Sequence, residues 1–375
     1  MPRLPHTLLR RAHGISPHLR TLLPACRDIE SARHELRWIR EHVRSSPPSE
    51  SSRSHGAQQP LTSYISPGRD AEEQKVARLC ARRGRGEPLQ YVLGTQPFGA
   101  LEIRCTSGVL IPRPETEAWA VYLADVLARH YRGVDNAGSD HHPVVLDLCT
   151  GTGCIALLLH ERLRRLGLPR VRAAGLDVSP LAVTLARHNR DANARAGRLS
   201  LPRPDGIVFQ QADVFAPDAL ARRRGVPPGR AGVDVLVSNP PYISGDGFAR
   251  GTGRSVRNYE PALALVPGGE AMRAAAAELG CALEDVFYAR LFDVARELRP
   301  DFVLFEVGDL EQARRVVKMA ARMGSGHEFG CEIWRDEPDA EGFEEVYDMG
   351  PELGLATIRG EGHGRSVFVY RKSKA

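Results

Sequence analysis

The spacing of apolar residues predicts helices in the first part of the chain. In residues 28–44, apolar positions recur every three or four residues between Arg and Glu, which is the pattern of an amphipathic helix. Residues 71–82 repeat this pattern over a shorter stretch. The Ser- and Pro-rich residues 45–63 predict a flexible loop, because such a composition buries little apolar surface. We therefore expect a small helical N-terminal domain over residues 28–86.

Residues 87–117 carry a strand pattern instead. Leu101, Ile103 and Cys105 alternate with charged residues, and Val109–Ile111 form a second apolar run after a Ser-Gly pair. Such alternation around a glycine predicts a β-hairpin. This hairpin would link the helical domain to residues 118–375.

In the rest of the chain, short apolar runs alternate with helical patterns. The strand candidates are residues 144–148, 171–177, 207–210, 233–238, 302–306, 332–334 and 367–370, and helical patterns include 271–299 and 310–323. Strands that alternate with helices predict an α/β fold with a parallel sheet covered on both faces. We expect a Rossmann-like domain with a seven-stranded, mostly parallel sheet and an antiparallel edge hairpin. Residues 133–142, 197–206 and 216–232 are predicted to be surface insertions.

Composition narrows the class of protein. Hydrophobic residues make up 42% and charged residues 26% of the chain, so a sizeable core can form. No apolar run approaches the roughly 20 residues of a membrane-spanning helix, and we expect no membrane partner. The net charge of +5 is too small to indicate nucleic-acid binding. Seven scattered cysteines with no C-x-x-C pair argue against disulfides and against a zinc site, so no metal is expected.

The first 27 residues contain arginines and leucines but no acidic residue. This composition is typical of a mitochondrial transit segment, so residues 1–27 are predicted to direct the chain to mitochondria. The alternative is a basic first helix of a cytoplasmic protein.

A glycine loop follows the strand at 144–148. In "VLDLCTGTGCIALLL" the strand contains Asp147, and Gly151 and Gly153 open the next helix. Glycines let the backbone turn sharply and approach a ligand at the N–H groups of a helix start. NAD, FAD and S-adenosylmethionine sites all use such a loop, but the G-x-G-x-x-G spacing of dinucleotide folds is absent. The alternative is a plain strand-to-helix turn.

Carboxylates end the next two strands. Asp177 could accept hydrogen bonds from two ribose hydroxyls, or it could be a surface acid beside the Ser179 helix cap. Asp213 would lie beside an adenine amino group with Val214 against the ring, or it could simply be a turn residue.

The sharpest motif is Asn239-Pro240-Pro241-Tyr242, directly after the fourth strand. The two prolines remove two N–H donors, which leaves the Asn239 amide oxygen and the Pro240 carbonyl as acceptors. Two acceptors beside an aromatic ring suit a planar –NH2 group. A bare Asn-Pro turn is the alternative.

These motifs together resemble the HemK/PrmC family of N5-glutamine methyltransferases. The resemblance spans roughly residues 30–371 and is carried by "GEPLQYVLGTQPFG", "GVLIPRPETE", "LDLCTGTG", "GLDVSPLAV", "SNPPYI" and "NYEPALAL". It implies S-adenosylmethionine as cofactor and, as substrate, the glutamine of the Gly-Gly-Gln motif in a class I peptide-chain release factor. The basic N-terminus is similar to that of the mitochondrial branch. We expect a monomer with no stable nucleic-acid partner.

The resemblance also assigns roles to residues. The cofactor loop would be Cys149, Thr150, Gly151, Thr152 and Gly153, with Asp177 on the ribose and Asp213 and Val214 at the adenine. Asn239, Pro240 and Tyr242 would be catalytic, and with Pro241 they would bind the substrate glutamine. Asn239 would also contact the cofactor. Arg113, Glu115 and Glu117 would lie near the mouth of the site. Cys149 replaces a common glycine, Val214 replaces a common aromatic residue, and residues 245–257 and 270–284 depart from the usual spacing.

Two other functions fit parts of this pattern. The amino group of adenine in a nucleic acid could occupy the same acceptors, but base flipping needs aromatic stacking and a basic groove, and only 6% of the residues are aromatic. The fold could also be a non-catalytic scaffold for a translation partner. The intact Asn239–Tyr242 loop argues against a scaffold.

Overall fold

The computed structural model describes residues 3–45, 67–135, 143–201, 206–216, 232–324, 328–342, 344–351 and 353–372. Nearly all of the loop expected over 45–63, and most of the insertions expected over 133–142 and 216–232, lie outside these residues. The chain divides into two compact units. One comprises Met1–Gly94 with Gly253–Tyr259, and the other comprises Thr95–Thr252 with Glu260–Ala375.

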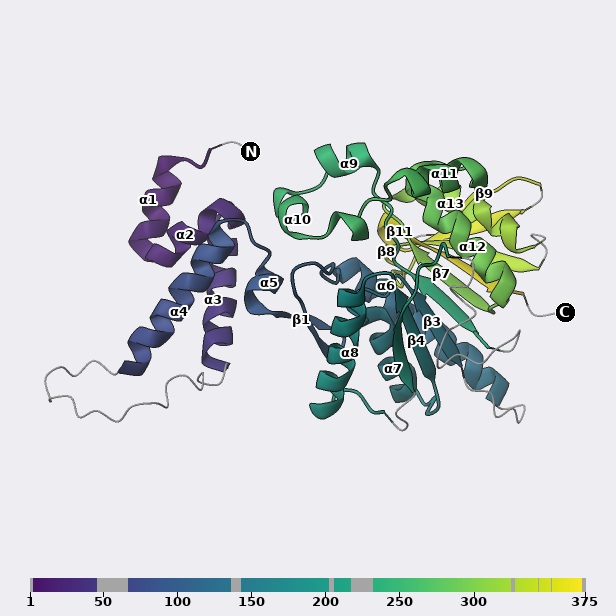
Figure 1. Ribbon diagram of the computed structural model, residues 1–375, viewed down its shortest axis with the longest axis horizontal. Helices are drawn as coiled ribbons and strands as arrows, with labels where there is room; N and C mark the ends of the chain where they lie inside the picture. Colours follow the sequence, from purple (N-terminus) through teal and green to yellow (C-terminus); the bar gives the residue numbers. More distant parts are fainter. Residues whose placement is uncertain are drawn as a thin grey trace, which may run out of the picture. The chain divides into compact units, whose positions relative to one another are not determined.

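The first unit is helical (Figure 1). Its helices are α1 (His6–Ile15), α2 (Pro17–Cys26), α3 (Ile29–Ser45), α4 (Pro67–Gly84), α5 (Leu89–Leu93) and α10 (Arg254–Tyr259). Helices α3 and α4 occupy the two stretches in which helical spacing predicts them. Helix α3 buries Leu36 and Ile39 because they lie on one face of the helix.

The arginine-rich N-terminal segment is part of this unit's core. Helix α1 buries Ala12, and α2 buries Leu19, Leu22 and Leu23 in the same cluster as the apolar residues of α3 and α4. Ser16 separates the two helices, and its side chain accepts a hydrogen bond from the backbone N–H of His18. The targeting role of residues 1–27 stays a prediction.

The second unit begins with a hairpin of β1 (Thr95–Phe98) and β2 (Leu101–Arg104). The hairpin exists, but the prediction that Val109–Ile111 is its second strand was wrong. Val109 instead packs against a helix, next to Ala182. The backbone N–H of Ile111 donates to the buried Glu260 carboxylate, 3.1 Å away, so it is not available to a strand ladder.

A nine-stranded sheet follows, in the order β5-β4-β3-β6-β7-β11-β8-β10-β9. Its strands are β3 (Val144–Leu148), β4 (Arg172–Asp177), β5 (Ile207–Gln211), β6 (Val235–Ser238), β7 (Phe302–Glu306), β8 (Phe329–Glu337), β9 (Glu344–Asp348), β10 (Leu355–Arg359) and β11 (Glu361–Arg371). The neighbours from β5 to β7 pair in parallel, and β11 pairs antiparallel with both β7 and β8. The mostly parallel Rossmann-like fold is thus confirmed.

The observed sheet differs from the predicted sheet in two respects. All seven predicted strands are present and form one continuous block, but β10 and β9 extend the sheet beyond seven. Val346 of β9 and Leu355 of β10 are 71% and 65% exposed, so these strands lack the buried apolar run on which the prediction rested. The antiparallel strand β11 lies inside the sheet, between β7 and β8, and the antiparallel pair at the edge is formed by β10 and β9.

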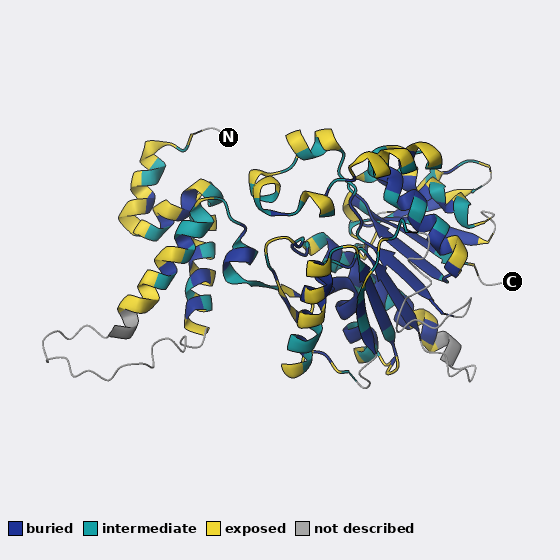
Figure 2. Ribbon diagram, in the orientation of Figure 1, coloured by how far each residue is buried: buried dark blue, intermediate teal, exposed yellow. Residues whose placement is uncertain are grey.

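Helices cover both faces of this sheet (Figures 1 and 2). The covering helices are α6 (Pro114–Asp135), α7 (Cys154–Arg165) and α8 (Pro180–Arg195) on one face and α12 (Val286–Leu298) and α13 (Leu310–Lys318) on the other. The unit also contains α9 (Gly245–Arg250), α11 (Glu270–Leu279) and short 3-10 turns at Ala262–Ala264, Leu283–Asp285 and Met319–Met323. The helical stretch expected over 271–299 is broken at Gly280, which ends α11 in the left-handed conformation.

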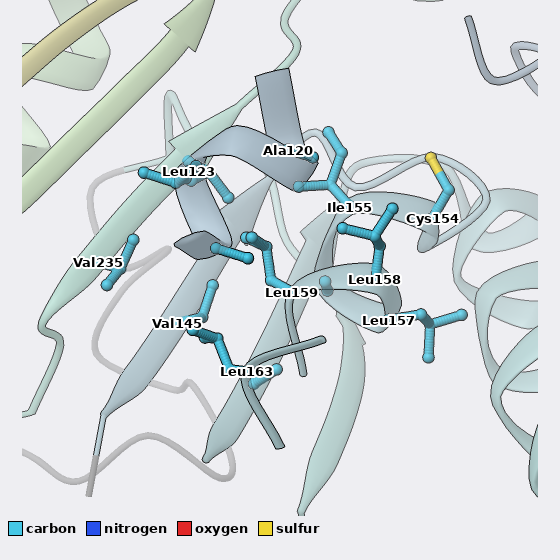
Figure 3. Packing of buried hydrophobic residues seen from close by; sticks show 14 of the residues in the cluster. Ala120, Leu123, Val145, Cys154, Ile155, Leu157, Leu158, Leu159, Leu163 and Val235 are labelled. Atoms are coloured by element: carbon cyan, nitrogen blue, oxygen red, sulfur yellow. The ribbon is translucent and has the colours of Figure 1, made fainter. Parts of the chain in front are cut away.

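The alternation of strand residues explains the two layers. Val145 of β3 belongs to the same apolar cluster as Leu123 of α6 and Leu159 of α7, and Figure 3 shows these three side chains. Its neighbour Leu146 points to the other face and belongs to the cluster of α12 and α13. A strand buried on both faces is what a parallel sheet between two helical layers requires.

Candidate active site

A cavity of about 340 Å³ lies at the carboxyl ends of β3, β4, β5 and β6. In open α/β sheets this is the edge where ligands bind. The cavity is lined by the loop after β3, by Asp177, Asp213 and Val214, and by Asn239 and Pro241. Sequence segments that lie far apart along the chain thus meet at one place.

The loop after β3 is fixed by its neighbours. The Thr150 hydroxyl donates to Asp147 at 2.6 Å, and the Thr150 N–H donates to the carbonyl of Leu176 at 3.0 Å. Gly151 and Gly153 have φ angles of 55° and 80°, which only glycine adopts without strain. Cys149, with a φ of 61°, adopts the same left-handed region without being glycine.

Gly153 is also needed for space. A Cβ on Gly153 would lie 2.8 Å from the ring of Phe209, which is fully buried on β5. Gly175 of β4 faces the same ring, and a Cβ there would lie 2.5 Å from it. Phe209 therefore supports the loop, and the loop can lie on it only because both positions are glycine.

Asp177 connects the end of β4 to this loop. One carboxylate oxygen accepts from the Gly151 N–H at 2.8 Å, and the other accepts from the Ser179 N–H at 2.9 Å. Burial raises the pKa of Asp177, and these two hydrogen bonds oppose that rise. A carboxylate has about four acceptor positions, so Asp177 keeps free lone pairs at the cavity wall.

An apolar wall stands next to Asp213. The carboxylate of Asp213 accepts from the Phe215 N–H at 2.9 Å, and the carbonyl of Val214 accepts from the Arg290 guanidinium at 2.9 Å. Phe287 also lines the cavity, and its ring meets that of Phe215 edge to face with 5.0 Å between the centroids. No sequence motif pointed to Phe287, because it lies in a helix far along the chain from the other residues of the site.

The Asn-Pro-Pro-Tyr loop brings only some of its residues to the cavity. Asn239 and Pro241 line it, whereas Pro240 and Tyr242 do not belong to its lining. The Tyr242 hydroxyl donates to Glu306 at 3.2 Å, and its carbonyl accepts from Gln312 at 3.2 Å. Burial and the nearby Glu306 charge raise the pKa of Tyr242.

Asn239 is oriented by a residue that the sequence did not reveal. Its side-chain N–H donates to the Thr116 hydroxyl at 3.4 Å, and that hydroxyl donates to Glu306 at 2.6 Å. Thr116 lies in the same motif as Arg113, Glu115 and Glu117 but was not singled out. Its partner Glu306 ends β7, 190 residues away.

The other residues of that motif differ in position. Arg113 lines the cavity and forms an ion pair of 2.7 Å with the buried Glu260. Glu260 also accepts from the Ile111 N–H, so it holds the cavity wall formed by residues 108–113. Glu115 and Glu117 are half-buried in the first turn of α6 and do not line the cavity.

The described part of the chain contains neither a candidate metal-binding cluster nor a helix that could cross a membrane. It contains no group of three or more His, Cys, Asp and Glu side chains arranged to hold a metal ion. None of the described helices has the length and apolar character needed to cross a membrane.

Known proteins are similar to this chain along most of its length. The Saccharomyces cerevisiae protein named mitochondrial MRF1 N(5)-glutamine methyltransferase MTQ1 is 32% identical over 315 residues, which cover 83% of this chain and 78% of that protein. The Schizosaccharomyces pombe protein named probable MRF1 mitochondrial N(5)-glutamine methyltransferase mtq1 is 34% identical over 318 residues, which cover 84% and 88%. A release factor glutamine methyltransferase of Geobacter sulfurreducens is 33% identical over 256 residues, which cover 68% and 72%. No protein-family model matches the chain.

Together with these relatives, the fold and the glycine-loop cavity identify a class I methyltransferase that uses S-adenosylmethionine. Within that class, the identities over most of both chains show that this protein belongs to the HemK/PrmC family of release factor glutamine methyltransferases. The family resemblance of the motifs is confirmed.

Proposed function

We propose that this enzyme transfers a methyl group to the side-chain amide nitrogen, N5, of the glutamine in the Gly-Gly-Gln motif of a class I release factor in mitochondria. The observation that carries the proposal is the anchored amide of Asn239. Its N–H group is engaged by Thr116, while its oxygen accepts no hydrogen bond from the described residues at the cavity. An outward amide oxygen is an acceptor for the –NH2 group of a substrate glutamine.

The cavity fits the cofactor by its size and its chemistry. Its volume of about 340 Å³ falls within the roughly 300–1,000 Å³ of small-molecule sites. Asp177 has acceptors left for ribose hydroxyls, and Val214 and Phe287 offer apolar surface to the adenine. Residues 149–152 line the cavity and would form the wall along the rest of the cofactor, whereas Gly153 lies outside the lining. When bound, the cofactor supplies a methyl group on a positively charged sulfur, which is a good leaving group.

The chain's own residues would then position the substrate. An amide nitrogen is a poor nucleophile because its lone pair is delocalised into the carbonyl. The Asn239 oxygen and the Pro240 carbonyl would accept the two N–H bonds and turn the lone pair toward the methyl group. Pro241 and the ring of Tyr242 are the neighbours proposed to contact the glutamine side chain. The proton would leave to water after transfer, so no protein base is required.

The test is methyl transfer by the full chain. Purified protein is incubated with radiolabelled S-adenosylmethionine and a mitochondrial release factor, and the modified peptide is located by mass spectrometry. We expect one methyl group on the Gly-Gly-Gln glutamine and none on a release factor whose glutamine is replaced by alanine. Label on adenine-containing DNA or RNA oligonucleotides instead would support the nucleic-acid alternative. Saturable cofactor binding without transfer to any substrate would support the scaffold alternative.

Location in mitochondria is supported by the names of the two yeast relatives and by the acid-free, arginine-rich first 27 residues. A fluorescent protein fused to the C-terminus of the full chain should colocalise with a mitochondrial marker. A diffuse cytoplasmic signal would contradict import. Gel filtration with light scattering should give the mass of a monomer, and added RNA should not shift its elution.

A further inference from the structure

We propose that Thr116, held by Glu306, is the positioning residue that decides which end of the Asn239 amide faces the substrate. This inference rests on the proposed function, because it concerns the same acceptor oxygen. An asparagine side chain has a donor end and an acceptor end of nearly the same shape. An –NH2 substrate can be bound only if the acceptor end is presented.

The relay begins at Glu306, whose side chain lies in the core at the end of β7 with a residue exposure of 1%. The indole N–H of Trp119 donates to its Oε2 at 2.8 Å, and the Thr116 hydroxyl donates to the same oxygen at 2.6 Å. An indole nitrogen can only donate, so this oxygen must be an acceptor. Burial raises the pKa of Glu306, and the hydrogen bonds that its carboxylate accepts from Thr116, Trp119 and Tyr242 oppose that rise.

The direction of each hydrogen bond then follows from the number of hydrogens. The Thr116 hydroxyl has one hydrogen, which it gives to Glu306, so toward Asn239 it can only accept. Only the Nδ2 end of Asn239 can donate to it, across 3.4 Å. If the amide were reversed, the Asn239 oxygen would face the Thr116 hydroxyl oxygen with no hydrogen between them. At 3.4 Å the contact is longer than the usual range, roughly 2.7–3.2 Å, of an N–H···O hydrogen bond, as is common in catalytic sites that hold no substrate.

The same carboxylate also holds the loop from its other end. Its Oε1 accepts from the Tyr242 hydroxyl at 3.2 Å, three residues after Asn239. Glu306 therefore fixes both the position of the Asn-Pro-Pro-Tyr loop, through Tyr242, and the orientation of its first side chain, through Thr116. The second effect is separable, because Thr116 can be changed without touching Tyr242.

The experiment compares Thr116→Val with Thr116→Ser. Valine keeps the shape of threonine but has no hydroxyl, whereas serine keeps the hydroxyl and the relay. We expect Thr116→Val to lower kcat for methyl transfer about tenfold or more, with the Kd for S-adenosylmethionine and the Tm close to those of the wild type. Thr116→Ser should recover most of the lost kcat. Equal losses in both variants, or full turnover in Thr116→Val, would overturn the proposal.

A readout without catalysis separates this proposal from the proposed function. In protein labelled with 15N-asparagine, the side-chain NH2 signal of Asn239 is identified by its loss in Asn239→Ala. This signal should shift in Thr116→Val and stay near its wild-type position in Thr116→Ser. If the wild type methylates no release factor, the proposed function fails while the NH2 signal still tests the relay. An unchanged signal in Thr116→Val would overturn the relay whatever the activity.

Discussion

Asp177 accepts a hydrogen bond of 2.8 Å from the backbone N–H of Gly151, so the carboxylate at the end of one strand holds the loop that follows the neighbouring strand. The same carboxylate is proposed to bind the cofactor's ribose. The two tasks use different lone pairs of one side chain. Asp177 therefore both organises and completes the cofactor site.

Asp177→Asn should weaken cofactor binding about tenfold or more. Asparagine can accept only at one side-chain atom, so either the Gly151 N–H or the Ser179 N–H would face an –NH2 group, and a ribose acceptor would be lost. Isothermal titration with S-adenosylmethionine measures the Kd. Asp309→Asn is the matched control, since Asp309 caps α13 outside the cavity lining and the Gln312 N–H needs only one acceptor there. Equal affinity in Asp177→Asn and the wild type would contradict the assignment.

Asn239→Ala should separate binding from chemistry. Cofactor affinity should remain within about twofold, because most of the cofactor's proposed contacts are with other residues. Methyl transfer should fall by about 10²-fold or more, since a group that orients the reacting nitrogen acts mainly in the transition state. Single-turnover rates at saturating cofactor measure this loss. Full turnover by the variant would refute the role of Asn239.

Gly153→Ala should destabilise the protein more than Gly151→Ala. Both positions have positive φ, so each alanine costs about 1 kcal/mol of backbone strain. Only at Gly153 would the new methyl group also collide with Phe209, whereas nothing lies within 4 Å of a Cβ on Gly151. Overpacking typically adds about 1–3 kcal/mol. Urea unfolding measures the free energy of unfolding of the two variants. When Phe209→Leu is added to Gly153→Ala, it should return part of the stability that Gly153→Ala loses.

Asp147 gives a pH dependence of stability with a definite sign. Burial raises the pKa of Asp147 from its usual 3.8 to about 7, with the hydrogen bond from Thr150 opposing the rise. Between about pH 4 and pH 7 the folded protein keeps a proton that the unfolded chain has released. The free energy of unfolding should therefore fall as the pH rises through this window, by up to about 1.4 kcal/mol per pH unit from this group.

The control for this prediction is Asp147→Asn, which cannot titrate and still accepts from Thr150. The stability of the variant relative to the wild type should increase from pH 4 to pH 7 and then stay constant. Thermal unfolding of both proteins across this range measures the difference. Parallel curves would show that the Asp147 carboxyl group titrates equally in both states.

The sequence predicted the central strands because each is a short apolar run between helical patterns. Val144–Leu148 is buried along its whole length and has an unmistakable pattern. The edge strand β9 leaves Val346 exposed, and its pattern of exposed residues is that of a surface loop. Its strand geometry comes from pairing with β10, which a local pattern does not contain.

The candidate site was predictable to the extent that its residues sit in short motifs. Asp177 and Asn239 follow apolar strands, and the fold brings both to one cavity. Thr116 was missed because its role depends on Glu306, a contact across 190 residues. Tyr242 was expected to offer its ring to the substrate, and the structure places its hydroxyl on Glu306. Its contact with the glutamine stays a prediction.

The arginine-rich segment, which is predicted to direct the protein to mitochondria, also forms two helices of the first unit. A protease that cut after residue 27 would remove Leu19, Leu22 and Leu23 from the apolar cluster that they share with Ile39 of α3. A targeting segment of this kind would be recognised while the polypeptide is unfolded and would then remain as part of the folded protein. The same residues would then serve both mitochondrial targeting and core packing. We would therefore expect the imported protein to keep its leucine-bearing second helix.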